Sequence, residues 1–211
     1  MRNIFSSRRT QLLLTALFCS TAFALAARAE TLPTVTINDN RPPAGTLAGG
    51  VLKLNLEMRE GICHPLEENG DAIKIFAFAE SGKPLSAPAP LLRVPEGTRI
   101  ELTVKSMINV PATLHGMHER PGSAKDVAVI EPGETKQISF LAGKPGTYSY
   151  WVGAPVDGAP VRRLMDSQLA GAFVVDPPGT KPDDRIFILT RWNGPLRTMI
   201  NGKSWPFRSE E

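Results

Sequence analysis

Apolar and polar residues alternate with a period of two along much of this chain. The stretches with strand-like character are residues 51–58, 73–78, 100–104, 127–130, 137–141, 147–152 and 170–175. A period of two places successive side chains on opposite faces of an extended segment, so each stretch predicts a β-strand. Beyond the first 29 residues, the only helical expectation is one or two turns within 162–169.

Proline–glycine pairs separate the predicted strands. They occur at 95–97, 131–134 and 144–146, where proline presets the first turn angle and glycine supplies the positive one. Residues 154–161 contain two prolines and one glycine and are expected to form a loop. Several short strands at this spacing predict an all-β fold built as a β-sandwich.

The first 29 residues have the three parts of an export signal. Basic residues open the segment, an apolar run follows at 12–25, and a small-x-small cleavage site lies at 27–29. Residues 7–12 also resemble a twin-arginine signal. The apolar run is short for a membrane span. We therefore expect a signal peptide over 1–29, a periplasmic or secreted product, and no membrane anchor after the signal is removed.

Removal of the signal changes the charge and the cysteine content. The full chain has 24 Lys and Arg against 21 Asp and Glu, and the signal contains four arginines and no acid. The remaining chain is close to neutral, which gives no support for nucleic acid as a partner. Cys63 is then the only thiol, which excludes an intramolecular disulfide. It is expected to be buried and inert, with a metal ligand or an intermolecular bridge as alternatives. His64 follows it, but adjacent strand residues face opposite ways.

Composition divides the rest of the chain into three parts. Residues 30–49 are polar and rich in Pro, Thr and Gly, and predict an extended, weakly ordered arm. Residues 50–178 hold most of the predicted strands. A Pro- and Gly-rich linker opens the segment 179–211, which has too few strands to bury a sheet of its own. This tail could pack on the first domain, pair with another chain, or begin a second, incomplete domain, and we favour the last.

Four separated segments carry a resemblance to a known family. Residues 145–153, PGTYSYWVG, are similar to the motif P-G-T-Y-W-Y-H-S-H, and residues 114–117, LHGM, are similar to H-x-H-G. Residues 91–98 and 168–176 resemble a strand-and-turn unit and a closing Q-x-x-G-x-x-x-V segment. In this order they resemble the N-terminal, plastocyanin-like cupredoxin domain of multicopper oxidases. The resemblance implies a Greek-key β-sandwich of the cupredoxin type, with residues 201–206 similar to the entry of a further cupredoxin domain.

The resemblance also implies four copper-ligand positions, most of which have lost their histidine. In the family, this domain supplies two histidines from each motif to a copper cluster that reduces oxygen. The corresponding positions here are Thr113, His115, Trp151 and Gly153, so His115 alone is retained. Trp151 is expected to be buried in the space left by the metal, and its replacement by alanine to cost about 3–5 kcal/mol.

A second, smaller metal site is conceivable around the retained histidine. His115, Met117 and His118 are all ligand types that suit copper. In a regular strand, His115 and Met117 would share one face and His118 the other, so a bend is needed to bring them together. The alternative is a hydrogen-bonded framework histidine beside a surface one. No catalytic residue is predicted, because no nucleophile–histidine pair, acid–base pair or phosphate-binding loop is recognisable.

Two functions remain open at this stage. The first is an exported multicopper-oxidase-like protein, with copper binding and oxidoreductase chemistry implied by the resemblance but no activity expected of this chain alone. The second is a non-catalytic cupredoxin module that binds a partner or holds a single copper ion. Whether the chain belongs to an enzyme is undecided. The partners expected are further cupredoxin domains or other copies of the chain.

Overall fold

All the regular secondary structure in the described residues consists of β-strands. The computed structural model describes residues 31–65, 70–123, 126–156, 159–161, 168–193 and 196–204, and the expected signal peptide lies outside them. Every strand belongs to one unit, Leu32–Glu211. Within the described ranges, no helix has the length and apolar character needed to cross a membrane. The all-β prediction is confirmed.

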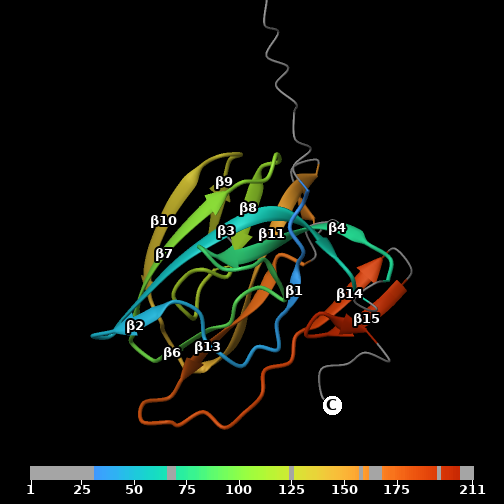
Figure 1. Cartoon of the computed structure of the whole chain (residues 1–211). Coiled ribbons are helices and arrows are strands. Elements are labelled where there is room, and N and C mark those ends of the chain that lie inside the picture. The colour runs from blue at the N-terminus through green and yellow to red at the C-terminus, as the bar shows by residue number, and fades with distance from the viewer. Residues whose placement is uncertain are drawn as a thin grey trace, which may run out of the picture. The chain divides into compact units, whose positions relative to one another are not determined.

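Two sheets form the body of this unit (Figure 1). The first has the order β1-β5-β4-β3-β7-β10, with β2 added beside β3. Its strands are β1 (Thr36–Ile37), β2 (Thr46–Ala48), β3 (Val51–Cys63), β4 (Ile73–Glu80), β5 (Ser86–Ala87), β7 (Arg99–Ser106) and β10 (Thr135–Leu141). The parallel neighbours β3 and β7 are not consecutive in the chain, as expected for Greek-key connections.

The second sheet has the order β6-β13-β11-β8-β9, with β12 beside the end of β11. Its strands are β6 (Leu92–Pro95), β8 (Ala112–His115), β9 (Val127–Ile130), β11 (Gly146–Val156), β12 (Ala159–Val161) and β13 (Ala170–Asp176). The two sheets bury their facing sides against each other, which is the arrangement of a β-sandwich.

The core between the sheets follows the period-two pattern of the sequence. On β3, Leu52, Leu54 and Leu56 are each at most 2% exposed, whereas the residues between them face solvent. From the second sheet, Tyr150 and Phe173 are both fully buried. Because one face of β3 is apolar, the alternation fixes which of its residues point into the core.

The hairpin of β11 and β12 corrects one expectation. Residues 154–161 were expected to form a loop because of their prolines, yet Ala154–Val156 pair with Ala159–Val161. Pro155 and Pro160 are opposite each other in this pairing. Proline cannot donate to a ladder, and β12 has β11 as its pairing partner at the border of the sheet, where such residues are tolerated. The helical turn expected within 162–169 falls mainly on residues outside the described ranges.

The N-terminal arm is held along most of its length. Val35 donates from its amide to the Ile62 carbonyl at 2.7 Å, and β1 pairs in parallel with β5. Farther along, the Ala44 amide donates to the Leu91 carbonyl at 2.8 Å. The arm is extended in this structure, but these hydrogen bonds tie it to the body of the fold rather than leaving it loose.

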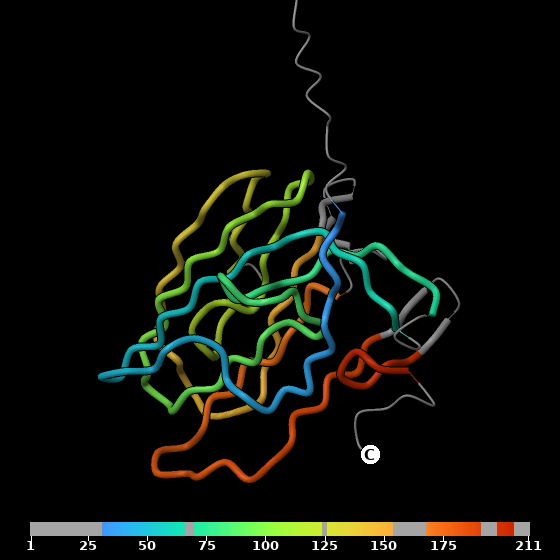
Figure 2. The backbone as a smooth tube through the Cα atoms, in the orientation of Figure 1, coloured from blue at the N-terminus to red at the C-terminus, as the bar shows by residue number. Residues whose placement is uncertain are grey.

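The C-terminal segment forms a third, small sheet that contacts the arm. Its strands are β14 (Leu189–Asn193), β15 (Leu196–Ile200) and β16 (Lys203–Ser204). Asn201 and Gly202 make the turn between β15 and β16, both with positive φ. Asn201 is 1% exposed, and its Oδ1 accepts a hydrogen bond from Asn40 Nδ2 at 2.9 Å. Figure 2 shows the N-terminal arm in blue passing beside the C-terminal strands in red. The domain boundary near residue 178 stays a prediction.

Candidate functional site

The four positions that correspond to copper ligands lie together on one face of the second sheet. Trp151 is opposite His115, and Gly153 is opposite Thr113, in the antiparallel pairing of β11 with β8. Their neighbours Leu114, Tyr150 and Val152 are buried in the core between the sheets. Because side chains alternate along a strand, the four positions face away from that core.

The imidazole of His115 and the indole of Trp151 are stacked on each other. Their ring centroids are 3.9 Å apart and the planes differ by 7°. Trp151 keeps partial exposure, whereas the adjacent Tyr150 is fully buried. The expectation that Trp151 is buried in the interior was therefore wrong, because its indole lies on the outer side of the sheet. The alternation of β11 turns Tyr150 into the core and leaves Trp151 to pack across the outer surface of the sheet.

The donor set at these positions does not fit a copper centre. His115 offers an imidazole nitrogen, but the indole N–H of Trp151 is a donor without a lone pair for a metal. Thr113 contributes a hydroxyl and Gly153 has no side chain. Copper in proteins is held by several imidazole or sulfur ligands around one point. Across the described ranges, no group of three or more His, Cys, Asp or Glu side chains could hold a metal ion.

Met117 and His118 are directed into different surroundings from His115. Strand β8 ends at His115, and Gly116 follows with a φ of 83°. Met117 then packs into the main core at 6% exposure. The Nδ1 atom of His118 is 2.9 Å from the Glu119 carbonyl oxygen and 4.0 Å from an Asp126 carboxylate oxygen. The assumption that His115 and Met117 share one strand face fails because the strand stops between them.

Gly116 is required by the close approach of two chain segments. A Cβ added there would lie 2.3 Å from the Ser149 carbonyl oxygen on β11, in addition to the positive φ. Only glycine accommodates both the conformation and the contact. This glycine ends the pairing of β8 with β11 directly beside the His115–Trp151 stack, so it sets the border of the candidate site.

Arg120 provides hydrogen-bond donors at the point where β8 leaves the sheet. Its guanidinium donates to the carbonyl oxygens of Gly116 at 3.1 Å and Ser149 at 3.3 Å. It also lies 4.9 Å from the centre of the Tyr148 ring. Burial lowers the pKa of Arg120 from its ordinary value. The residue replaces backbone donors that a longer β8 would have supplied, and no sequence signal had pointed to this role.

A second arginine, also missed from the sequence, ties down the segment that follows β13. Arg93 on β6 binds Asp176 through two hydrogen bonds of 2.9 and 2.7 Å, and its third nitrogen is 2.7 Å from Asp184. The Arg93 side chain is 10% exposed. The guanidinium holds the pKa of Asp184 below its ordinary value. Its planar geometry suits this bidentate contact, as lysine would not.

The single thiol expected to be inert is indeed buried. Cys63 is 2% exposed and packs in a secondary core with Val35 and Ile75. Burial raises its pKa to about 11, so the thiolate is disfavoured. The neighbouring His64 has its Nδ1 atom 3.0 Å from the Gly70 carbonyl oxygen. The two residues do not form a shared site.

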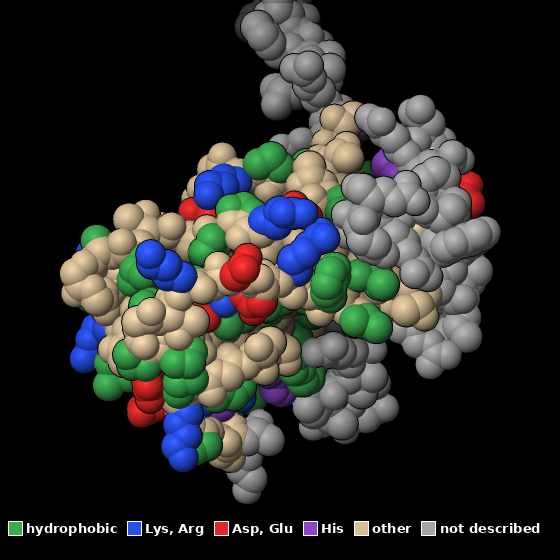
Figure 3. Space-filling view, turned by 90° about the horizontal axis from the view of Figure 1, so that it is seen from below, with side chains coloured by type: hydrophobic (Ala, Val, Ile, Leu, Met, Phe, Trp, Pro, Cys, Tyr) green, Lys and Arg blue, Asp and Glu red, His purple; other side chains and the backbone are tan. Residues whose placement is uncertain are grey.

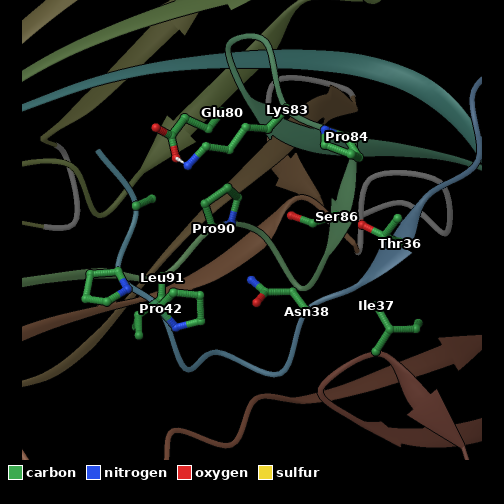
Figure 4. A pocket seen from close by; sticks show the side chains of 12 residues that line it. Thr36, Ile37, Asn38, Pro42, Glu80, Lys83, Pro84, Ser86, Pro90 and Leu91 are labelled. Atoms are coloured by element: carbon green, nitrogen blue, oxygen red, sulfur yellow. Dashed lines mark hydrogen bonds and ion pairs between the residues drawn. The ribbon is translucent and has the colours of Figure 1, made fainter. Parts of the chain in front are cut away.

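A groove between the arm and the β4–β5 hairpin lies away from this face (Figure 4). Its volume is about 210 Å³, and prolines form much of its wall. Asn38 donates within the protein to the carbonyl oxygens of Pro88 and Ala89. Lys83 and Glu80 pair with each other at 2.7 Å. These polar groups are already engaged, so the groove does not identify a ligand.

Comparisons with known proteins place the fold. No protein-family model matches the chain. It is 23% identical over 151 residues to a probable nitrite reductase–hydroxylamine oxidoreductase fusion protein of Kuenenia stuttgartiensis, covering 66% of this chain and 17% of that protein. Among solved structures, a multicopper oxidase of Campylobacter jejuni described as a metallo-oxidase matches with a TM-score of 0.57 and 23% identity, over 82% of this chain and 41% of that one.

Two further solved structures are similar to this chain. A blue copper oxidase of Nitrosomonas europaea matches with a TM-score of 0.54 and 23% identity, over 74% of this chain and 54% of that one. A copper-containing nitrite reductase of Thermus scotoductus matches with a TM-score of 0.51 and 20% identity, over 72% and 38%. The chain thus spans about half or less of these relatives. Together with the two-sheet topology, these matches show that the chain has the cupredoxin-like fold found in multicopper oxidases and copper nitrite reductases.

Proposed function

We propose that this chain is an exported, non-catalytic cupredoxin module whose role is to bind another protein. One observation carries the proposal. At the four positions where the family resemblance implies copper-binding histidines, the structure has a single imidazole, and that ring is stacked on an indole. A copper cluster that reduces oxygen needs several imidazoles from this domain, and the residues present supply one.

Export is part of the proposal and depends on the first 29 residues. The basic start, the apolar run and the small-residue cleavage site support a signal peptide. A lone, buried thiol with a raised pKa is compatible with an oxidising compartment, because it has no partner cysteine and little thiolate. A periplasmic or secreted location is the one we propose.

The competing function is that of a copper-dependent oxidoreductase subunit, and the fold likeness favours it. The solved structures with this fold are a multicopper oxidase, a blue copper oxidase and a copper-containing nitrite reductase. Under this alternative the remaining ligands would come from another domain. The chain spans 41% of the Campylobacter jejuni oxidase, which leaves room for such a domain in the relatives.

A copper titration of the purified chain without its signal tests the proposal, because a chain that completes a copper site by itself would bind the ion. We expect no stoichiometric copper binding by isothermal titration calorimetry, and no oxygen uptake with phenols or cuprous ion in an oxygen electrode. One tightly bound copper ion per chain, or chelator-sensitive oxygen uptake, would contradict the proposal.

A designed variant tests the placement of the four positions. The substitutions Thr113→His, Trp151→His and Gly153→His put four imidazoles on two paired strands, where directly opposite Cβ atoms are about 4.5–5.5 Å apart. Imidazole suits copper, so this variant should gain copper binding while the parent does not. Circular dichroism checks that the variant is folded. A folded variant without affinity for copper would show that the four side chains do not converge.

A further inference from the structure

Uncharged amide groups join the N-terminal arm to the C-terminal sheet of β14, β15 and β16. On the side of the molecule drawn in Figure 3, by contrast, Lys and Arg side chains lie among Asp and Glu side chains. At the contact, Asn201 in the turn between β15 and β16 meets Asn40 in the arm, and the two residues are 1% and 3% exposed. Burial of an amide is costly unless it is hydrogen-bonded, so this contact depends on how completely the amides are paired.

Four hydrogen bonds hold the side-chain amide of Asn201. Its Oδ1 accepts from Asn40 Nδ2 at 2.9 Å and from the Ile188 amide at 2.8 Å. Its Nδ2 donates to the carbonyl oxygens of Asp39 at 3.3 Å and Ile186 at 3.1 Å. A side-chain amide has two donor hydrogens and two lone pairs on its oxygen, so all four positions are used. We name this amide and its four partners the Asn201 latch.

The residue after Asn201 is a glycine in close contact with the body of the fold. Gly202 has a φ of 80°, and a Cβ added there would collide with the Ala87 carbonyl oxygen and lie 3.2 Å from Cδ1 of Ile37. Figure 4 shows Ile37 on the arm, beside the C-terminal strands. Both the conformation and the contact therefore require glycine. The fold thus demands an Asn–Gly pair in this turn.

An Asn–Gly pair is prone to deamidation. The backbone nitrogen of the glycine attacks Cγ of the asparagine, so that a bond forms between these atoms and the bond from Cγ to Nδ2 breaks. Nδ2 leaves as ammonia and takes with it the proton that the glycine nitrogen gives up. Water then opens the cyclic imide at either of its carbonyl carbons, which produces an aspartate or an isoaspartate. Glycine favours the ring closure because it has no side chain in the way.

The Asn201 latch opposes this reaction while the C-terminal sheet is docked. Ring closure requires Cγ of Asn201 and the nitrogen of Gly202 to move into bonding distance. That movement turns the amide away from its four partners and leaves buried donors and acceptors unpaired. Gly202 is also packed against β5, which restricts its own movement. The turn must therefore leave the arm before the reaction can proceed.

The product of the reaction does not fit the latch. An oxygen replaces Nδ2 and faces the carbonyl oxygens of Asp39 and Ile186, which accept hydrogen bonds and cannot donate them. A buried carboxylate oxygen without a donor is costly. An isoaspartate also adds one carbon to the backbone of the turn. Either product therefore opposes the return of the C-terminal sheet to the arm.

We propose that Asn201–Gly202 is a deamidation site that the docked C-terminal sheet protects, and that the reaction releases this sheet irreversibly. Undocking frees the Asn201 amide, the reaction replaces it with a carboxylate, and the carboxylate keeps the sheet apart from the arm. This inference goes beyond the binding role proposed above and does not depend on it, because it involves neither copper nor a partner.

Peptide mapping by mass spectrometry tests the protection. The signal-free chain is incubated at mildly alkaline pH, with and without guanidinium chloride. In the denatured chain Asn201 should react at a rate similar to those of Asn69 and Asn193, which also precede glycine. In the native protein it should react at least about 100-fold more slowly, which is about 2.8 kcal/mol of protection. Equal rates with and without denaturant would overturn the protection, and no reaction at Asn201 in denaturant would overturn the site.

Two glycine variants establish whether the latch is responsible. Asn40→Gly removes one partner of Asn201 and tolerates the positive φ of 56° at position 40, so it should accelerate the native reaction by about 10-fold. Asn55→Gly is the matched control, because Asn55 is exposed on β3 and its loss weakens the sandwich away from the latch. It should leave the rate at Asn201 unchanged. Equal acceleration by both variants would show that the reaction follows global unfolding, and an unaltered rate in Asn40→Gly would exclude the latch.

The variant Asn201→Asp tests the release directly. Met199 on β15 is 1% exposed in the secondary core, whereas Met107 is 51% exposed. Dilute hydrogen peroxide should oxidise Met107 equally in parent and variant, and Met199 about 10-fold faster in the variant. Circular dichroism shows whether the variant is folded, and the deamidation rates of the parent do not depend on it. A folded variant in which Met199 is as protected as in the parent would overturn the release.

Discussion

Two adjacent aromatic residues on β11 provide a direct test of how this strand is oriented. Tyr150 is fully buried between the sheets, and its hydroxyl donates to the Pro90 carbonyl. Trp151 packs on His115 at the outer side and remains partly exposed. We predict that Tyr150→Ala destabilises the protein more than Trp151→Ala, although indole is the larger side chain.

The expected losses in the free energy of unfolding follow from how deeply each side chain is buried. A partly exposed Trp removes about 150 Å² from water, which is about 4 kcal/mol at about 25 cal/mol per Å² and about 2–3 kcal/mol after correction for the compact unfolded chain. Its loss from the outer face opens a gap to solvent and leaves no enclosed cavity. Tyr150→Ala leaves a cavity and an unpaired Pro90 carbonyl, for about 4–5 kcal/mol. The structure therefore lowers the value of about 3–5 kcal/mol that the sequence suggested for Trp151.

Urea and thermal unfolding of the two variants beside the parent measure this difference. For a chain of this length, each kcal/mol shifts the unfolding midpoint by about 2–4 °C. We expect shifts of about 5–10 °C for Trp151→Ala and about 10–20 °C for Tyr150→Ala by this scaling. If Trp151→Ala costs as much as Tyr150→Ala, the indole is in the core, and the outward placement of the four ligand positions is refuted.

Three further predictions concern single residues elsewhere in the fold. Gly116→Ala should lower the free energy of unfolding in urea by more than about 3 kcal/mol. Gly133 has a similar φ of 78° but open space around it, so Gly133→Ala should lower it by about 1 kcal/mol. Equal losses would contradict the close contact at Gly116. Arg93→Met should cost about 3 kcal/mol through an unpaired, largely buried carboxylate at Asp176. Because Arg93 lowers the pKa of Asp184, that contact stabilises the fold above the ordinary Asp pKa and is lost as the pH falls, so the variant should show a flatter acid limb of stability against pH. Burial raises the pKa of Cys63 from 9.0 to about 11, so stability should fall as the pH rises through this window, and Cys63→Ala should remove that part of the decline.

The sequence allowed the strands and the core to be predicted better than the surroundings of the candidate site. Alternation on β3 identified its buried residues, because one side is apolar and the other polar. On β11 both sides carry large aromatic residues, so alternation could not decide whether Tyr150 or Trp151 faces the core.

Contacts between distant segments account for the rest. The sequence motif placed His115 and Trp151 in related positions, and the pairing of β8 with β11 brings them together. It contained no sign that Gly116 would end β8 beside Ser149, or that Arg120 would bind the carbonyl left there. These features depend on residues about 30 positions apart, which local propensity cannot connect.

The hydrogen bond between the amides of Asn40 and Asn201 has a consequence for the order of assembly. These residues are 161 positions apart, and Asn201 also donates to the Asp39 carbonyl. During synthesis, the strands from β3 to β13 emerge before Asn201 does, so the sandwich has all its own strands while the arm still lacks this contact. Closing so long a loop is entropically costly and is rewarded only when both ends are present. The stretch of the arm around Asn40 thus receives its hydrogen bonds to Asn201 only after the rest of the arm can already pair with residues 62–91.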